Sequence, residues 1–366
     1  MITKLRLKNW KSFKDSTLYI DPLTILIGIN ASGKSNVLDA LDFLKNVVTS
    51  NSRLIDTIEQ TRGGKDWLIK RGEKQCELEI TLKDFDDECI CAVQIFNKDG
   101  GFIYERHIIE LNGVKCETPD LKDGDNMLRL FQQTSDGLTI AEKMAHFEQV
   151  VSEDLKNLFV FNPVPEKMRG YSSVSSELKP DGSNIAGVIA SLPKDEKEKL
   201  EAELTKYVSP LPEKDIRKIQ SVTVGLNNSD AMLYCYEEWN PDKPIDARGM
   251  SDGTLRFAAI VLALLTAKPH SLLVIEGIDN GLHPSRAKEL VKVMKELSQK
   301  RSVDILCTTH NPVLINELGN DMIPFISYVK RDNEGNSVIE LLEEKDNLAK
   351  LMASSTIGGI MTEDKL

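Results

Sequence analysis

The chain has 366 residues, of which 41% are hydrophobic and 28% charged, so it has the composition of an ordinary globular protein with length for about two average domains. This composition argues against a disordered chain, a collagen or a coiled-coil rod. The formal net charge of −11 argues against a protein that coats nucleic acid by bulk charge and leaves only a local basic face open.

The six cysteines show no disulfide framework, because most of them lie inside apolar runs that are typical of strands. Cys89 and Cys91 fall on one face of such a strand, and no histidine stands near them to complete a zinc site. The first segment lacks the apolar core of a signal peptide, and no apolar run reaches the ~18 residues of a membrane helix. We therefore expect a reduced, cytoplasmic protein with no membrane contact.

Three strands and one helix are predicted at the start of the chain. Residues 2–7 and 16–20 have the pattern of a hairpin around residues 9–15, and residues 23–27 form a short apolar strand of the buried kind. Apolar residues then recur at helical spacing from residue 34 to about residue 48, directly after a glycine-containing loop. The order is strand, loop, helix.

An antiparallel lobe and a mainly helical middle are predicted next. Residues 75–116 return to strand patterns, with turns at residues 97–101 and 112–113. Residues 140–219 are mainly helical around a polar loop at residues 172–183. The charge-rich helix faces further along this middle segment, at residues 194–206, are interpreted as a solvated surface.

Strands alternate with helices in the last third. Short strands at residues 222–224 and 232–236 precede a proline-bearing loop at residues 240–250. There follow a long apolar helix from near Gly253, a strand at 272–275, a helix at 284–297, a strand at 303–308, a helix after Pro312 and a hairpin around 332–336. This alternation predicts a parallel-type sheet that is covered on both faces.

One segment matches the phosphate-binding loop pattern in full. It reads Gly28, Ile29, Asn30, Ala31, Ser32, Gly33, Lys34 and Ser35. At ordinary glycine usage a chain of this length would match about once in a hundred by accident. Because the loop joins a strand to a helix, its N–H groups and the helix N-terminus can converge on a phosphate, Lys34 can add a charge and Ser35 can bind Mg²⁺.

The start of the chain and two later motifs resemble ATPases of the SMC/RecF type within the ABC-like superfamily. Asn30, Asn36 and residues 2–13 resemble the family's opening. Ser251 and Gly253, in SDGT at a predicted helix start, resemble the signature motif, which faces the γ-phosphate bound by the other subunit of an ATP-sandwich dimer. His310, in TTHNP after a strand, resembles the switch histidine that contacts the γ-phosphate. Alone, SDGT is typical of a helix cap, so the order of the motifs carries the resemblance.

Residues 272–284 resemble the Walker B strand and the D-loop, with one departure. In the family this strand ends in two acids, of which the first holds Mg²⁺ and the second orients or deprotonates the attacking water. An alignment without gaps puts Glu276 at the metal position and Gly277 at the catalytic one. A slip by one residue would instead make Glu276 the base and leave Ile275 facing the metal. Because a positioned base is worth about 10² to 10⁴ in rate, the gapless alignment implies slow hydrolysis. Asp279 is a weaker candidate for that base.

The resemblance implies an α/β fold, namely an ABC-type ATPase head with a mixed, largely parallel core sheet, an antiparallel β lobe and a helical insertion. The expected composite head spans residues 1–366, with an N-terminal lobe at 1–120, the insertion at 121–220 and a C-terminal lobe at 221–366. Gln132 and Gln133 are the candidates for the glutamine that senses Mg²⁺ between the lobes. No sustained heptad repeat predicts a coiled-coil arm.

The resemblance also implies ATP and Mg²⁺ as cofactors and a homodimer, or a higher oligomer, joined through the ATP sandwich. The first functional hypothesis is an ATPase whose ATP-driven dimerisation regulates a separate effector, such as a nuclease or toxin, in anti-phage defence or DNA maintenance. Relatives of the OLD type carry a nuclease domain after the ATPase, and too little of this sequence follows His310 for one.

Two other hypotheses stay open. One is a stand-alone repair ATPase similar to RecF that binds DNA through a basic edge formed by Lys4, Arg6, Lys8, Lys11 and Lys14. Protection of an edge strand explains these lysines equally well. The other is an ATP-binding scaffold that does not hydrolyse ATP, which the glycine at position 277 would allow.

Overall fold

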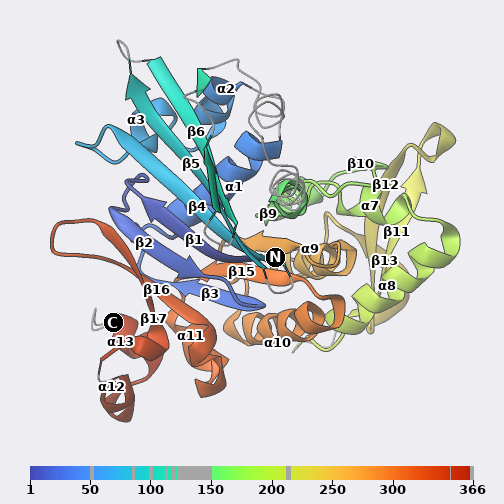
Figure 1. Ribbon diagram of the computed structural model, residues 1–366. Coiled ribbons are helices and arrows are strands. Elements are labelled where there is room, and N and C mark those ends of the chain that lie inside the picture. The colour runs from blue at the N-terminus through green and yellow to red at the C-terminus, as the bar shows by residue number, and fades with distance from the viewer. Residues whose placement is uncertain are drawn as a thin grey trace.

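A mixed core sheet is built from both ends of the chain (Figure 1). The computed structural model describes residues 1–49, 53–84, 87–98, 102–111, 114–117, 121–122, 151–211, 216–346 and 348–362. The sheet has the order β17 (Ser337–Leu341), β16 (Ile326–Arg331), β3 (Leu23–Ile27), β15 (Asp304–Thr309), β14 (Leu272–Ile275) and β9 (Phe159–Phe161). Its pairs are parallel except for the hairpin of β16 and β17. The predicted α/β fold with a mixed, largely parallel core sheet is confirmed.

Helices cover one face of the core sheet, and a helix with a second sheet covers the other. Ile25 and Ile27 of β3 pack toward α9 (Asp252–Thr266), α10 (Pro284–Arg301) and α11 (Pro312–Leu318). Leu26 points the other way and packs with α1 (Lys34–Thr49) and the antiparallel sheet. The central strands are buried at every position, which explains why their sequences are mostly apolar. The predicted bounds of β3 and β14 agree with the structure.

The antiparallel lobe lies above the core sheet in Figure 1. Its strands are β2 (Asp15–Tyr19), β1 (Ile2–Lys8), β4 (Gln75–Asp84), β5 (Asp87–Lys98), β6 (Phe102–Leu111) and β7 (Val114–Glu117), in that spatial order, and β8 (Leu121–Lys122) also pairs with β6. The short helices α2 (Leu54–Gln60) and α3 (Lys65–Leu68) join α1 to β4. The predicted hairpins of this lobe are confirmed. Cys76, Cys89 and Cys91 are buried here, as are Cys235 and Cys307 elsewhere, and none of these five forms a disulfide.

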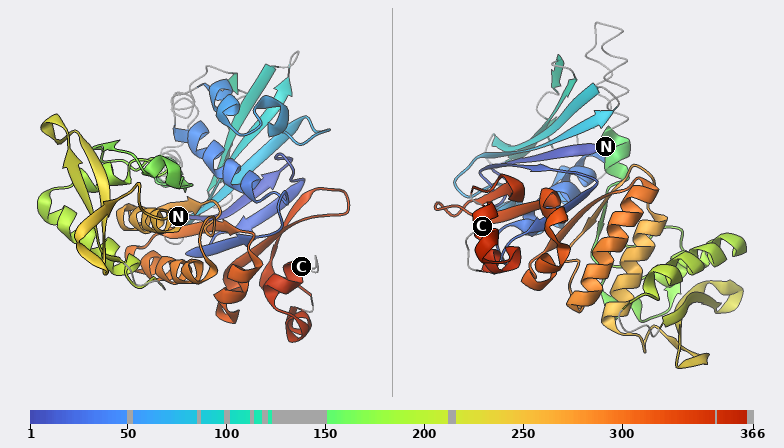
Figure 2. Two further views of the ribbon diagram at one scale, coloured as in Figure 1. Left: turned by 180° about the vertical axis from the view of Figure 1, so that it is seen from behind. Right: turned by 90° about the horizontal axis from the view of Figure 1, so that it is seen from below.

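A smaller sheet lies at the opposite side of the core sheet from the antiparallel lobe (Figures 1 and 2). It contains β10 (Ser172–Ser173), β11 (Ile216–Val224), β12 (Asp230–Glu237) and β13 (Asn240–Asp246). The helices α7 (Ile185–Ala190) and α8 (Lys194–Val208) contact β11. Figure 2 also shows α9 and α10 side by side, between this region and the rest of the molecule.

Two predictions in this region are wrong in part. The middle segment was expected to be mainly helical, yet β9, β10 and the start of β11 are strands. Three- and two-residue strands carry too few positions to show a period, so β9 and β10 leave no local signal. The expected loop at residues 240–250 begins with β13, whose prolines are tolerated because this strand pairs only with β12 and lies at an edge.

The chain ends on the predicted hairpin, β16 and β17, followed by α12 (Leu348–Ser354) and α13 (Ile357–Thr362). Short α6 (Pro165–Met168) follows β9. No helix in the described ranges is both long and apolar enough to span a membrane. Gln132 and Gln133 lie outside the described residues, and the lobe boundaries at residues 120 and 220 stay predictions.

Candidate nucleotide-binding site

Close contact with the C-terminal hairpin, β16 and β17, explains the two glycines of the phosphate loop. Gly28 and Gly33 have positive φ values of 149° and 122°. A Cβ on Gly28 would lie 2.3 Å from the Val329 carbonyl oxygen, and one on Gly33 would lie 2.4 Å from the Ser337 hydroxyl. Both positions therefore exclude side chains because the C-terminal hairpin lies directly against the loop.

The C-terminal hairpin also holds the loop by hydrogen bonds. The Arg331 guanidinium donates to the carbonyl oxygen of Ala31 at 3.0 and 3.2 Å, and to that of Gly335 at 2.8 Å. Ala31 itself has a φ of 62°. The Ser337 hydroxyl donates to the Ser32 carbonyl. Arg331 belongs to no recognised motif, so the sequence alone could not predict its contact with the loop.

Lys34 curls over the loop that precedes it. Its ammonium donates to the carbonyl oxygens of Gly28 and Ile29 at 2.7 and 2.8 Å. Burial lowers the pKa of Lys34 to about 8, and the charge of Asp279 opposes this shift. Asn30 is exposed at the loop tip, whereas the Asn36 side chain donates to the Ser12 hydroxyl at 2.8 Å and so ties α1 to the turn after β1.

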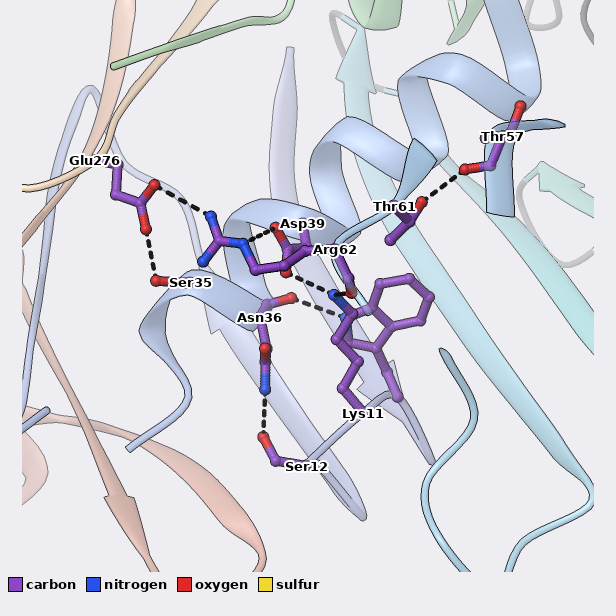
Figure 3. Close-up of polar contacts among 10 residues, drawn as sticks. Lys11, Ser12, Ser35, Asn36, Asp39, Thr57, Thr61, Arg62 and Glu276 are labelled. Atoms are coloured by element: carbon purple, nitrogen blue, oxygen red, sulfur yellow. Dashed lines mark hydrogen bonds and ion pairs between the residues drawn. The ribbon is translucent and has the colours of Figure 1, made fainter. Parts of the chain in front are cut away.

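Ser35 and Glu276 meet across the site although 241 residues separate them (Figure 3). The Ser35 hydroxyl donates to Glu276 Oε1 at 2.6 Å. Ile275 is fully buried in β14, which favours the gapless alignment with Glu276 on the metal side. A hydroxyl and a carboxylate oxygen are ligands that Mg²⁺ prefers, and phosphates and water commonly complete its octahedron. The described residues contain no cluster of three or more His, Cys, Asp and Glu that would form a closed metal cage.

Arg62, which the sequence did not single out, faces Glu276. Its guanidinium lies 3.3 Å from Glu276 Oε2 and 3.7 Å from Asp39 Oδ1. The Lys11 ammonium contacts Asp39 Oδ2 at 2.6 Å and donates to the Arg62 carbonyl oxygen at 2.7 Å. Figure 3 shows this chain of contacts from Lys11 to Ser35. The arrangement places a second, half-exposed cation beside the metal carboxylate.

No carboxylate occupies the catalytic position after Glu276. Gly277 has a φ of 58°, and a Cβ there would lie 2.2 Å from the Asn280 amide nitrogen. The Gly277 N–H donates to the Thr308 hydroxyl at 2.8 Å. Asp279 is buried, and its carboxylate accepts a hydrogen bond from Thr309 at 2.7 Å, which does not support it as a substitute base.

Arg256 joins the signature helix to the Walker B turn. This residue of α9 is buried, and its guanidinium donates to the carbonyl oxygens of Pro163, Glu276 and Gly277 at 2.5 to 2.8 Å. Burial lowers the pKa of Arg256, which the charges of Asp279 and Glu276 oppose. One side chain therefore fixes the backbone that presents Glu276.

The signature residues lie in a separate cleft. Ser251 is the N-cap of α9 and accepts from the Thr254 N–H, and Arg286 donates to the Thr254 hydroxyl at 3.0 Å. A cavity of about 470 Å³ is lined by Arg169, Ser251, Asp252, Gly253, Gly281, His283 and Arg286. No residue of the phosphate loop lines it. His310 is exposed directly after β15. The structure thus brings Ser35 and Glu276 together and keeps Ser251 and Gly253 apart from them.

The family model described as "AAA domain, putative AbiEii toxin, Type IV TA system" matches residues 23–316. The chain therefore belongs to this family of AAA domains.

Curated relatives extend this result. The OLD nuclease of Thermus scotoductus is 21% identical over 372 residues, which cover 95% of this chain and 66% of that protein. The DNA double-strand break repair Rad50 ATPase of Thermoplasma volcanium is 36% identical over 84 residues, or 23% of this chain and 8% of that protein. A chromosome partition protein Smc of Synechocystis is 32% identical over 93 residues, which cover 24% of this chain and 7% of that protein. The chain spans less than two thirds of the length of these relatives.

Solved SMC heads share the fold. An Smc head bound to the C-terminal winged-helix domain of ScpA has a TM-score of 0.53 at 16% identity and covers 93% of this chain and 96% of its own. The Smc head with a coiled coil and joint from Pyrococcus yayanosii has a TM-score of 0.52 at 11% identity, with 96% and 99% covered. The resemblance is confirmed: this is an ABC-like AAA ATPase of the SMC/RecF type.

Proposed function

We propose that ATP and Mg²⁺ bind between the phosphate loop and Glu276 and join two copies of the chain into an ATP-sandwich dimer. The contact of Ser35 with Glu276 carries this proposal, because it brings the two Mg²⁺ ligands together. The N-terminus of α9 lies in a cleft without phosphate-loop residues, so it is free to meet the γ-phosphate on a second copy. Ser251, Gly253 and His310 are the proposed γ-phosphate contacts.

The dimer is proposed to be long-lived and to regulate a separate effector, such as a nuclease or toxin, in anti-phage defence or DNA maintenance. Gly277 supports slow turnover, since no general base stands at the usual position. A slow ATPase suits a signal that must persist while a partner acts. The family name refers to a toxin and one relative is a nuclease, which supports this class of effector.

The basic edge, which motivated the hypothesis of a stand-alone DNA-binding ATPase, does not support it in the structure. Four of the five cations of the basic edge have a carboxylate partner: the ion pairs are Lys4 with Glu88, Arg6 with Asp15, Lys11 with Asp39 and Lys14 with Glu334. Their charges are thus largely neutralised within the chain. Steady-state phosphate release tests the hypothesis of a scaffold without hydrolysis.

Light scattering with and without Mg-ATP tests the dimer. We expect the mass of the wild type to double on addition of Mg-ATP, and Lys34→Ala to stay monomeric because it lacks the phosphate-loop cation. A wild type that stays monomeric at saturating ATP would contradict the proposal.

A matched pair of signature variants separates ATP binding from closure. Ser251→Asp and Ser251→Asn both keep an N-cap for α9, but only the first adds a negative charge where the γ-phosphate of the second copy would lie. We expect both to bind ATP and only Ser251→Asn to dimerise. Equal dimerisation of the two variants would remove Ser251 from the interface.

A further inference from the structure

A basic groove runs between α8 and the free edge of β11. It has a volume of about 850 Å³ and lies on the side of the molecule away from the antiparallel lobe (Figure 1). It is lined by Lys194, Lys197, Glu198, Glu201, Ala202, Thr205, Lys206, Arg217, Lys218 and Gln220. Five basic and two acidic side chains therefore line one groove of a chain whose net charge is −11.

Two side chains of α8 hydrogen-bond to the free edge of β11 and fix the position of the two walls of the groove. The Thr205 hydroxyl accepts from the Ile219 N–H at 3.0 Å, and Glu201 Oε1 accepts from the Ser221 N–H at 2.8 Å. Glu201 is buried and also lies 3.8 Å from the Lys197 ammonium. The Glu201 carboxylate is thus held by the edge of β11, and the nearby Lys197 ammonium balances its charge.

The remaining four cations form no ion pair with any residue that the structure describes. Lys194, Lys206, Arg217 and Lys218 form no ion pair within the described part of the chain, and Lys218 lies over the ring of Tyr236 instead. All four are exposed. This is the reverse of the basic edge at the start of the chain, where Lys4 and Lys14 each have a carboxylate partner. Glu198 also lines the groove, but five cations against two acids leave the lining net positive toward an external anion.

The lining favours a nucleic acid over a protein segment. Ala202 is the one apolar residue of the lining, whereas protein interfaces are centred on apolar and aromatic anchors and are depleted in lysine. Interfaces with nucleic acid are polar and strongly positive. Lys194 and Lys206 stand twelve residues apart on α8, which is about 18 Å at 1.5 Å per residue. A row of that length suits a backbone with regularly spaced phosphates.

We propose that the groove between α8 and β11 binds the phosphate backbone of a nucleic acid, with Lys194, Lys206, Arg217 and Lys218 as the contacting cations. This site goes beyond the proposed ATP-driven dimer and does not rest on it, because none of its residues belongs to the phosphate loop, the signature or the Walker B turn. It reassigns DNA contact from the basic edge to the other side of the molecule.

The test measures binding of a fluorescein-labelled 30-base-pair DNA duplex, and of one of its strands alone, by anisotropy at several salt concentrations and without nucleotide. The groove variant is Lys206→Gln with Arg217→Gln. The matched control is Lys4→Gln with Lys14→Gln, which removes the same charge from ion-paired lysines. Exchange of the two groove cations, Lys206→Arg with Arg217→Lys, controls for folding.

We expect the wild type to bind at least one of the two probes and its affinity to fall as salt rises. The groove variant should bind at least tenfold more weakly, with a log–log salt slope smaller by about 2, because two phosphate contacts are lost. The ion-paired control and the exchanged variant should stay within about twofold of wild type. Absence of DNA binding, equal loss in the ion-paired control, or binding of poly-glutamate in preference to both DNA probes would overturn the proposal. ATP-dependent mass, measured separately, reports on the dimer alone.

Discussion

At the scale of single residues, the local packing around Gly277 accounts for the missing glutamate on which the proposal of slow hydrolysis rests. Its left-handed backbone and the Asn280 amide that covers it leave no room for the glutamate expected at this position. A side chain there would have to adopt a conformation that costs about 1–2 kcal/mol and displace Asn280. The local packing therefore explains why position 277 holds a glycine instead of the glutamate of the family.

Restoring the base needs two changes. We expect Gly277→Glu alone to lower the free energy of unfolding by about 1–3 kcal/mol, because both the backbone and Asn280 oppose it. In the Asn280→Ala background the same substitution should raise steady-state turnover at least about tenfold, since a general base contributes about 10² to 10⁴. The measurement is phosphate release under saturating Mg-ATP.

The comparison variant is Asn280→Ala without the glutamate. If its turnover equals that of the double variant, the glycine at position 277 does not limit hydrolysis, and this outcome would contradict the proposed effect of Gly277. If neither variant nor the wild type releases phosphate while ATP still binds, the protein is a scaffold that does not hydrolyse ATP.

At the scale of elements, α9 is tied to the turn after β14 by a single buried guanidinium. Arg256 donates hydrogen bonds to three carbonyl groups, one in the loop after β9 and two in the turn after β14. A change at the N-terminus of α9 can thus reach the carbonyls of Glu276 and Gly277 directly. Sequence patterns predicted both elements correctly, because their apolar periods are local, but the link between them depends on how the helix packs.

Removal of this link should destabilise the fold. We expect Arg256→Met to lower the free energy of unfolding by about 3 kcal/mol, because it leaves buried carbonyl groups without a donor. Urea unfolding measures the change. The exposed Arg248→Met, which loses only a contact with neighbouring Asp246, should differ from wild type by less than about 0.5 kcal/mol. A similar effect of both substitutions would refute this role of Arg256.

At the scale of the whole molecule, segments from the two ends of the chain together form the core sheet and hold the phosphate loop. β3 from the N-terminal end lies between β15 and β16 from the C-terminal end, and the phosphate loop that follows β3 rests on the C-terminal hairpin. Arg331 reaches the Ala31 carbonyl across 300 residues of sequence. The shape of the loop therefore depends on a hairpin at the far end of the chain.

A hairpin variant tests this dependence. We expect Arg331→Met to weaken ATP binding about tenfold, since the loss of a charge-assisted hydrogen bond is worth about 1.5–3 kcal/mol. Isothermal titration with Mg-ATP measures it. Lys330→Met removes the same charge from the same hairpin, but Lys330 pairs with Glu340 and not with the phosphate loop, so the ATP affinity of this variant should match wild type. Equal affinities of the two variants would show that the loop keeps its shape without the hairpin.

The sequence by itself determined the phosphate loop, the order of the motifs and most strands and helices, because these depend on local periods and on residues at fixed spacing. The tertiary structure alone decided which cations are free. Lys4 and Lys14 look basic in the sequence and are paired. Lys206 belongs to a stretch interpreted as a solvated surface, yet it lines a groove together with Arg217, and neither of the two forms an ion pair with a described residue. The physical reason is that pairing and burial depend on segments far apart in the chain, for which no local pattern exists. Composition and charge, which argued only against bulk binding of nucleic acid, could not locate where a local basic face would lie.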